Sequence, residues 1–488
     1  MENIKSALPE WLAKRWEPIV TLALGVYFIA RLFYFAMGIV PDLPPDEHTH
    51  VGLIRLYAAA SPLFITDTPA SFQFGLVSSV PYLYHYLMGA ASALTGNDSY
   101  LTLRLFNIPL AFLFLVVAYR LAREVTANPL ARILFFVMLT NTLMSSFLWA
   151  SVNYDNLVNL LALLSVYFLV RLLSRGATTS CLLFLICMGL GALTKASFLP
   201  LALLLILVWL TARNRLLKSD FISLRQQVMA GNKPVIALLV LLAGCLSANL
   251  LLYGNNIVRY GQIKPGCSQV LDLKSCMANR IFARGWVLSQ YRDNKITFEQ
   301  AWNMAGRIWH AGDREATRVM LQNERMFRLK KPETLNFYDY LNVVWNQELK
   351  PSIFGILAHR SMLRSSAELT AYNLILLAGI IFFIRNIRFD QRDRAWGIFA
   401  FVCLGYFMLL LAFHHYPGYL VTHNVSLGTQ GRYLFVVIAP AYLLLSEFLL
   451  RKLKKWMQVL VVILVGFVFI NGDFPYFLEH VPASWRTQ

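Results

Sequence analysis

The chain has 488 residues, of which 57% are hydrophobic and only 14% are charged. A soluble protein carries about a quarter charged residues, so this composition excludes a soluble enzyme, a disordered protein and a disulfide scaffold. The formal net charge of +18 does not indicate a nucleic-acid partner, because basic residues concentrate at the cytoplasmic ends of membrane spans. We predict a multi-spanning protein whose partners include membrane lipids and no nucleic acid.

Apolar runs that are long enough to cross a bilayer, about 20 residues each, recur along the chain. The first follows a short basic segment and is too long for a signal-peptide core, so we expect a retained anchor with a cytoplasmic N-terminus. The predicted fold class is an all-α, polytopic transmembrane bundle of about eleven spans. They lie at 18–40, 102–121, 131–150, 156–173, 179–194, 196–211, 234–253, 368–386, 396–413, 432–450 and 457–471.

The Lys and Arg residues support this topology. The short loops on the predicted cytoplasmic side and the N-terminus hold 21 of the 44, and another 17 lie in the long outer segment 253–365. Five others lie at or near outer membrane ends, where topology disfavours a cation: Arg31, Arg55, Arg104, Lys195 and Arg432. An anionic ligand at the outer face would explain them. For Arg31 and Arg104 we favour snorkelling or structural pairing with a carboxylate.

Two carboxylates and two imidazoles follow the first span, in the segment PPDEHTH at 44–50. The prolines end the preceding helix, and Asp46 can cap a new one that runs through 51–60. Ionisable groups at this depth are costly, so a functional site is the default interpretation. A plain N-cap role is the alternative for Asp46, and structural roles explain His48 and His50 equally well. The spacing is not diagnostic of a metal site.

Further polar and aromatic segments fall on the same predicted face. The stretch 78–96 contains the motif PYLYHYL and is too short to span, which favours a helix in the outer interface. The other outer turns contribute Asp155, Lys195, Gln430, Arg432 and Tyr433. These segments therefore converge on one side of the membrane.

The cysteines divide into two groups. Four lie in predicted spans, where they are most simply buried apolar residues. Cys267 and Cys276 bracket eight residues of the long outer loop, which favours a disulfide over free thiols. The sequence has no Gly-rich phosphate loop, CxxC zinc pattern or HExxH helix, so nucleotide-driven transport and ordinary zinc hydrolysis have no support.

The order of these motifs resembles the GT-C superfamily of polyprenyl-phosphate-sugar-dependent glycosyltransferases. The acidic pair, PYLYHYL, an Asn-Tyr-Asp turn, a Leu-Thr-Lys turn and a late Gln-Gly-Arg-Tyr occur here in sequence. Relatives include the protein O-mannosyltransferases and the aminoarabinose transferase that acts on lipid A. One departure is that the outer soluble portion is an insertion between spans rather than a large C-terminal domain, so the acceptor cannot be carried over.

The resemblance implies inverting transfer of a sugar from a polyprenyl (undecaprenyl) phosphate carrier to a glycan or lipid acceptor. It further implies a bacterial inner membrane protein whose site faces the periplasm. We expect cell-surface polysaccharide such as O-antigen as the acceptor, with lipid A or protein as alternatives. A lipid-linked glycan polymerase or flippase is the rival function. Some relatives use a divalent cation (Mg²⁺ or Mn²⁺) and others do not, so no cofactor is assigned.

Residue roles follow from the resemblance and from the chemistry of transfer. Asp46 matches the catalytic acidic position and is the expected base, with Glu47 orienting the acceptor or exchanging roles with it. The expected phosphate ligands are Lys195 and Arg432, with Arg55 and His85 as weaker candidates. The expected substrate-binding residues are His48, His50, Tyr82, Tyr84, Asp155, Gln430 and Tyr433. Interface anchoring explains the tyrosines at 82, 84 and 433 equally well.

The sequence divides into three regions. A transmembrane module at 1–253 contains the catalytic first outer loop at 40–100, a helical periplasmic insertion occupies 254–366, and further transmembrane helices with an outer tail occupy 367–488. The stretch from Asn255 to Arg364 holds 17 basic and 9 acidic residues. We expect a small helical cap that shapes the acceptor groove, although a merely solvated surface fits the composition equally well.

Overall fold

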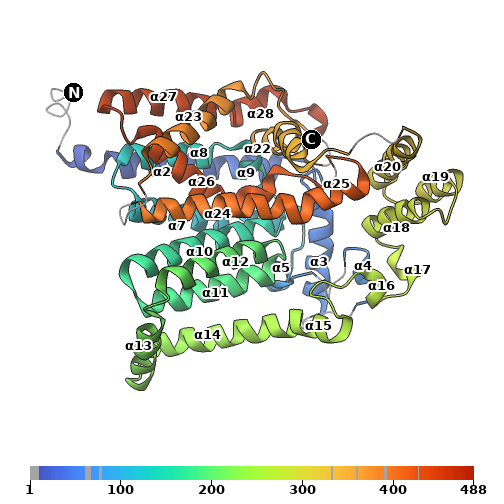
Figure 1. Ribbon diagram of the computed structural model, residues 1–488, viewed down its shortest axis with the longest axis horizontal. Coiled ribbons are helices and arrows are strands. Elements are labelled where there is room, and N and C mark those ends of the chain that lie inside the picture. Colours follow the sequence, from blue (N-terminus) through green and yellow to red (C-terminus); the bar gives the residue numbers. More distant parts are fainter. Residues whose placement is uncertain are drawn as a thin grey trace.

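A computed structural model describes residues 10–60, 67–75, 80–330, 334–358, 361–388, 393–426 and 428–487. These residues form helices, accompanied by two isolated β-bridges, so the predicted all-α class is confirmed. The long helices lie roughly side by side in Figure 1. Residues 1–9, which include part of the predicted cytoplasmic N-terminus, lie outside the described residues, as do Ser78 and Ser79 at the start of the predicted interface helix.

Seven to nine of the described helices are long and apolar enough to cross a membrane. The seven are Arg15–Gly38, Tyr100–Val125, Asp155–Arg175, Lys233–Tyr260, Arg394–Thr422, Gly431–Leu450 and Lys455–His480. Two bent pairs complete the nine: Pro129–Thr140 with Leu143–Trp149, at 65°, and Phe198–Arg213 with Leu217–Met229, at 95°. The remaining predicted spans are the shorter helices Thr178–Thr194 and Thr370–Asn386. The count of about eleven is therefore not confirmed, although every predicted span coincides with a helix.

Local sequence explains where several spans begin and end. Helix α8 (Pro129–Thr140) and helix α14 (Lys233–Asn249) each follow an asparagine whose side chain accepts a backbone N–H of the first turn, and each has proline in that turn. Helix α10 (Asp155–Arg175) ends at Gly176, which adopts φ 66° as a left-handed C-cap. These signals fix the ends of the helices on the side of the basic loops.

The interior of the bundle is formed by α8, α10 and α26 (Ile438–Leu450), whose residues are mostly buried. The buried Arg31 on α2 (Glu10–Gly38) forms an ion pair with the buried Asp473, which also accepts a hydrogen bond from Ser146 at 3.1 Å. This is the structural pairing that we favoured for Arg31. It joins two segments that lie more than 400 residues apart in the sequence.

A short helix pair lies across one end of the bundle. Helix α3 (Glu47–Ala60) runs across the direction of the long helices in Figure 1 and packs against α5 (Leu83–Thr95). Gly89 permits this contact, because a Cβ there would lie 2.7 Å from the Cβ of Tyr57 and 3.0 Å from the backbone of Ala58. From Leu83 onward the PYLYHYL motif thus forms part of α5, with Tyr84 and His85 buried and Leu87 exposed.

The insertion forms a helical cap at the same end of the bundle. Helices α18 (Arg280–Arg292), α19 (Phe298–Gly306) and α20 (Ala311–Lys330) surround a small apolar core of their own. Figure 1 shows them opposite α13 (Leu217–Met229), which lies at the other end. Cys267 and Cys276 form a disulfide that packs on Phe72 of α4 (Pro69–Phe72), so the start of the cap contacts the segment 40–100.

Candidate functional site

The loop that carries Asp46 is an unusual piece of backbone. Both Asp42 and Asp46 have positive φ, at 63° and 60°, which Asp tolerates better than most residues. The side chain of Asp42 accepts a hydrogen bond from the backbone N–H of His48 at 3.1 Å, in the first turn of α3. Asp42 thus makes a side-chain bond of the kind expected of a helix cap, and the Asp46 carboxylate contacts two arginines.

Asp46 lies between two arginines that come from distant parts of the chain. Its Oδ2 accepts a hydrogen bond from Nη2 of Arg432 at 2.7 Å, and its Oδ1 lies 4.0 Å from Nη2 of Arg280. The Asp46 side chain is 40% exposed, whereas that of Arg432 is only 3% exposed. A half-exposed carboxylate held by a buried guanidinium is open to solvent on one side, where a substrate hydroxyl can approach it.

A second carboxylate lies close to both Lys195 and Arg432. Asp155, at the start of α10, pairs with Lys195 and lies 3.5 Å from Nη1 of Arg432. The ammonium of Lys195 also lies 4.5 Å from the ring centre of Tyr154 and 4.9 Å from that of Tyr433. Such aromatic faces attract a cation. Lys195 and Arg432, the two predicted phosphate ligands, thus lie in one cluster with the predicted Asp155 and Tyr433.

Gln430 completes this cluster, because its side-chain oxygen accepts a hydrogen bond from Nε of Arg432. Both residues flank Gly431, at the start of the 3₁₀ helix η4 (Gly431–Val437). A Cβ at Gly431 would lie 2.5 Å from the carbonyl oxygen of Leu349, so glycine is required for this close approach. In the Gln-Gly-Arg-Tyr motif, close packing therefore explains Gly431, and contacts with carboxylates explain Arg432.

Glu47, predicted with Asp46 as part of the catalytic pair, occupies a different environment. Its side chain is fully buried, and each oxygen accepts two hydrogen bonds. Arg104 donates two of them, at 2.7 and 2.8 Å, and the backbone N–H groups of Asp42 and Val152 donate the others. All five N–H groups of Arg104 are used, the other three by carbonyls at the end of α2. This geometry gives Glu47 a positioning role and leaves it no capacity for an acceptor hydroxyl.

His50 and His85 form a buried pair beside the cluster. Nδ1 of His50 lies 2.9 Å from Nε2 of His85, and the His50 ring also packs against Tyr154 at 4.5 Å between ring centres. Burial lowers the pKa of His50 to about 3, and burial with the neighbouring His50 holds the pKa of His85 well below its usual value. Both imidazoles are therefore neutral near pH 7, so His85 contributes no positive charge to a phosphate.

Other predicted site residues lie apart from this cluster. Arg55 forms an exposed ion pair with Asp98 at 3.0 Å, and His48 lies exposed with Nδ1 3.4 Å from the Tyr100 hydroxyl. The predicted sugar-binding Tyr82 and Tyr84 are buried in the packing between helices. The Tyr84 hydroxyl lies 3.1 Å from Oδ1 of Asn107, to which it donates. These contacts match structural roles and leave the four side chains outside the Asp46 cluster.

The cap supplies cationic residues that the sequence did not single out. Arg280 and Arg284, one turn apart on α18, both pair with the buried Asp313 of α20, at 2.8 and 3.0 Å. His310 lies 2.9 Å from the same carboxylate. In the sequence, the excess of basic residues in the insertion indicated a cationic surface, but it could not show which of these residues lie near Asp46.

The carboxylates of the cluster are paired with basic side chains. No group of three His, Cys, Asp or Glu side chains among the described residues is arranged to hold an ion. Asp46 and Asp155 are instead paired with Arg432 and Lys195. The cluster therefore offers two carboxylates and two cations, and no metal ion is assigned to it.

The chain matches one family model, described as "Predicted membrane protein (DUF2142)", over residues 46–271, a little under half of its length. The matched stretch begins at Asp46 and includes Asp155 and Lys195. No curated protein sequence matches the chain.

Solved structures align with nearly the whole chain at low identity. The apo oligosaccharyltransferase of Archaeoglobus fulgidus is 14% identical, with a TM-score of 0.49, and the alignment covers 98% of this chain and 57% of that one. ArnT from Cupriavidus metallidurans, bound to undecaprenyl phosphate, is 14% identical with a TM-score of 0.38, covering 88% and 77%. The arabinosyltransferase EmbB from Mycobacterium smegmatis is 11% identical with a TM-score of 0.35, covering 95% and 42%.

These transferases are GT-C proteins, the superfamily that the sequence motifs resemble. The chain spans somewhat less than 60% of the length of the archaeal oligosaccharyltransferases.

Proposed function

We propose that this protein is an integral-membrane glycosyltransferase that moves a sugar from a polyprenyl-phosphate carrier to an acceptor hydroxyl. One observation carries the proposal: the half-exposed carboxylate of Asp46 is held by the buried Arg432, which Asp155 connects to the buried Lys195. Transfer requires a base for the acceptor and cations for the leaving phosphate, and this cluster offers both.

In the proposed reaction, Asp46 takes the proton from the acceptor hydroxyl as its oxygen attacks the anomeric carbon. The bond between that carbon and the phosphate oxygen breaks, and the electron pair leaves with the polyprenyl phosphate. Arg432 and Lys195 stabilise the charge that develops on this phosphate, the former as a planar donor and the latter as a compact charge. The transfer is direct and inverts the anomeric centre, with no covalent intermediate on the enzyme.

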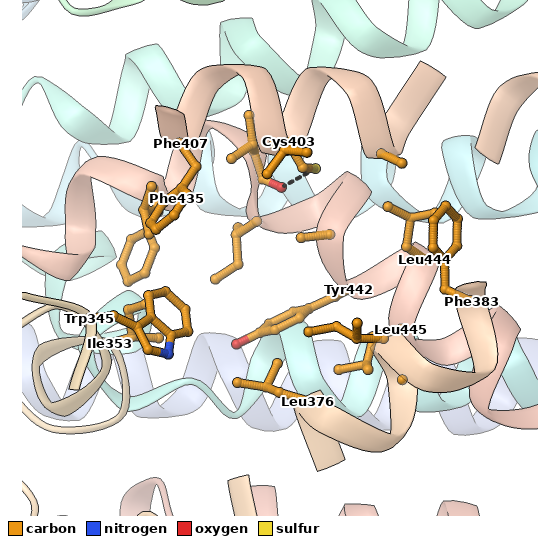
Figure 2. A pocket seen from close by; sticks show the side chains of 18 of the residues that line it. Trp345, Ile353, Leu376, Phe383, Cys403, Phe407, Phe435, Tyr442, Leu444 and Leu445 are labelled. Carbon is orange, nitrogen blue, oxygen red and sulfur yellow. Dashed lines mark hydrogen bonds between the residues drawn. The ribbon is translucent and has the colours of Figure 1, made fainter. Parts of the chain in front are cut away.

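An apolar cavity supports a lipid-linked donor. It has a volume of about 640 Å³, lies between α23 (Thr370–Asn386), α24 (Arg394–Leu410) and α26, and has no Lys, Arg, Asp, Glu or His in its lining. Figure 2 shows Trp345, Phe407 and Phe435 at one end of this cavity and Phe383 at the other. Phe435 follows Arg432 by three residues on η4, about 6 Å along a 3₁₀ helix. We assign this cavity to part of the polyprenyl tail.

The acceptor that we propose is a cell-surface polysaccharide such as O-antigen, at the periplasmic face of a bacterial inner membrane. The cap beside Asp46 carries Arg280 and Arg284, and a basic surface suits an anionic glycan. Lipid A and protein are the alternative acceptors. A flippase would need cations along a path through the bilayer, whereas these cations gather at one end of the bundle.

The experiment is sugar transfer in proteoliposomes, from a panel of radiolabelled polyprenyl-phosphate sugars to extracted cell-surface glycans. Asp46→Asn should lower kcat by about 10²- to 10⁴-fold, because it removes the base, while donor binding is retained. Lys195→Met should instead weaken donor binding. Asp98→Asn, which removes an exposed carboxylate paired with Arg55, is the matched control and should transfer normally.

Two results would contradict the proposal. Full transfer by Asp46→Asn would show that this carboxylate is not the base. Movement of a lipid-linked oligosaccharide across the bilayer without consumption of any sugar donor would instead identify a flippase.

A further inference from the structure

A second large cavity lies away from the cluster, between α2 and α7 (Ile108–Val125). Its volume is about 1000 Å³, and it is also lined by Phe136 of α8 and Tyr167 of α10. At one end the lining is entirely apolar, with Phe33 and Phe112 among its residues. At the other end, towards the basic loops, it contains Arg120 and Arg123.

The length of this groove matches one leaflet of a bilayer. Phe112 and Arg123 are eleven residues apart on one helix, which corresponds to about 16 Å. Half of a hydrocarbon core is about 15 Å thick. An acyl chain that lies along the groove with its carboxyl end at the arginines would therefore reach the bilayer midplane near Phe112.

Two hydroxyl groups in this groove have no protein partner within the described residues. These are Oγ1 of Thr21 and the hydroxyl of Tyr119, both buried and both on lining residues. Thr21 as a whole is only 7% exposed. Buried hydroxyls nearly always have a hydrogen-bond partner, and the hydrocarbon region offers no water. An occupant with oxygen acceptors near the basic end would satisfy both groups.

The charges at the basic end favour an anionic occupant. Glu124 also lines the groove, but it is engaged by Arg175, whose Nη2 and Nε lie 2.7 and 3.0 Å from its two oxygens. It therefore does little to neutralise Arg120 and Arg123. Arg123 lies 5.7 Å from the ring centre of Tyr119, which places that guanidinium beside one of the two hydroxyls.

We propose that this groove is a binding site for an anionic phospholipid of the leaflet on the side of the basic loops. The phosphate binds Arg120 and Arg123, the ester oxygens accept hydrogen bonds from Thr21 and Tyr119, and one acyl chain fills the apolar end. This site is independent of the donor cavity and of the proposed transfer reaction.

The test is native mass spectrometry of the full chain in detergent, with added dioleoyl-phosphatidylglycerol or dioleoyl-phosphatidylcholine. We expect one tightly bound phosphatidylglycerol and much weaker binding of phosphatidylcholine. Arg120→Gln with Arg123→Gln should weaken phosphatidylglycerol binding about 30-fold, since each basic side chain near an anionic membrane surface favours binding about fivefold. The matched control, Arg215→Gln with Lys218→Gln, removes two exposed charges on the same side and should bind normally.

A second variant distinguishes binding of a lipid inside the groove from general attraction of anionic lipids to the basic surface. Gly25 lines the groove on α2, and a Cβ there would meet only Leu115, at an ordinary 3.7 Å. Gly25→Leu keeps both arginines but fills the acyl-chain space, so it should also lose the bound lipid. Equal binding of the two phospholipids, or unchanged phosphatidylglycerol binding in the arginine variant or in Gly25→Leu, would overturn the proposal.

Discussion

Asp46 and Glu47 are neighbours in the sequence, yet their carboxylates lie in opposite environments. Glu47 is fully buried, and its four hydrogen bonds leave it no further capacity. Asp46 is 40% exposed and lies between two arginines from distant segments. The difference indicates that Glu47 holds the loop in place, whereas the carboxylate of Asp46 stays accessible to solvent. Adjacent acidic residues therefore need not share one chemical role, and the variants below test this division.

The largest stability effect is expected from Glu47→Gln. Removing one partner of a fully buried ion pair costs roughly 3–5 kcal/mol, because the other charge stays buried. Asp46→Asn should cost about 1 kcal/mol or less, because Asp46 is half-exposed and its buried partner Arg432 still lies 3.5 Å from Asp155. The measurement is the thermal unfolding midpoint of each variant in detergent, and similar losses in both would contradict the division of roles.

A double-mutant cycle sharpens this result. Arg104→Gln combined with Glu47→Gln should destabilise the protein by much less than the sum of the two single changes, since each single change leaves one unpaired charge. Additive losses would mean that Glu47 does not act through Arg104.

A smaller loss of stability is expected at acidic pH, from protonation of the buried histidines on α3 and α5. The pKa of His50 is about 3 in the folded protein, but near 6.5 in the unfolded chain. Between these values the unfolded state binds more protons, so stability is fully present above pH 6.5 and falls as the pH drops towards 3. From pH 7.5 to 5.0 the loss due to His50 is about 2 kcal/mol.

The check is the unfolding midpoint of the native chain and of His50→Gln at both pH values. The variant should lose less stability on acidification, because one of the two buried imidazoles is gone. The same acid-induced loss in both proteins would contradict the buried, neutral state of His50.

The smallest effect is expected at Asp42, whose side chain accepts a hydrogen bond in the first turn of α3. Asp42→Ala removes the acceptor for the His48 N–H and should cost about 1 kcal/mol. Asp42→Asn keeps an acceptor and tolerates the positive φ at this position, so it is the matched control and should cost less. Transfer activity should fall with Asp42→Ala, because the orientation of Asp46 depends on this turn. Unchanged transfer activity in Asp42→Ala would show that the Asp42 side chain does not orient Asp46.

The sequence predicted the parts of this molecule that depend on local composition. Apolar runs located the helices, and cations that the topology could not explain led to Lys195 and Arg432. The favoured pairing of Arg31 with a carboxylate is confirmed by Asp473. For the cations, the signal was a basic residue at a membrane end where topology disfavours one.

The rest depended on partners that no local pattern reveals. In the sequence, Glu47 resembles Asp46. Only the fold shows that Arg104, 57 residues later, donates two hydrogen bonds to the Glu47 carboxylate. The placement of Arg280 beside Asp46 depends on how the cap docks, and eleven cations of similar character lie in the insertion between 280 and 331. The sequence fits Tyr82 and Tyr84 to an interface or to a substrate pocket. Their burial in two apolar clusters depends on side chains from several distant segments of the chain.

The loop before Asp46 is also held by residues far along the chain. The Val40 N–H donates to the carbonyl of Trp485 at 2.9 Å, and the Thr487 N–H donates to the carbonyl of Gly38 at 2.9 Å. Trp485 itself is 1% exposed. During synthesis the ribosome releases this loop long before it makes Arg432 or Trp485. The first spans must therefore remain in the membrane with this loop incomplete, and the Asp46 cluster forms only after the late helices have been inserted.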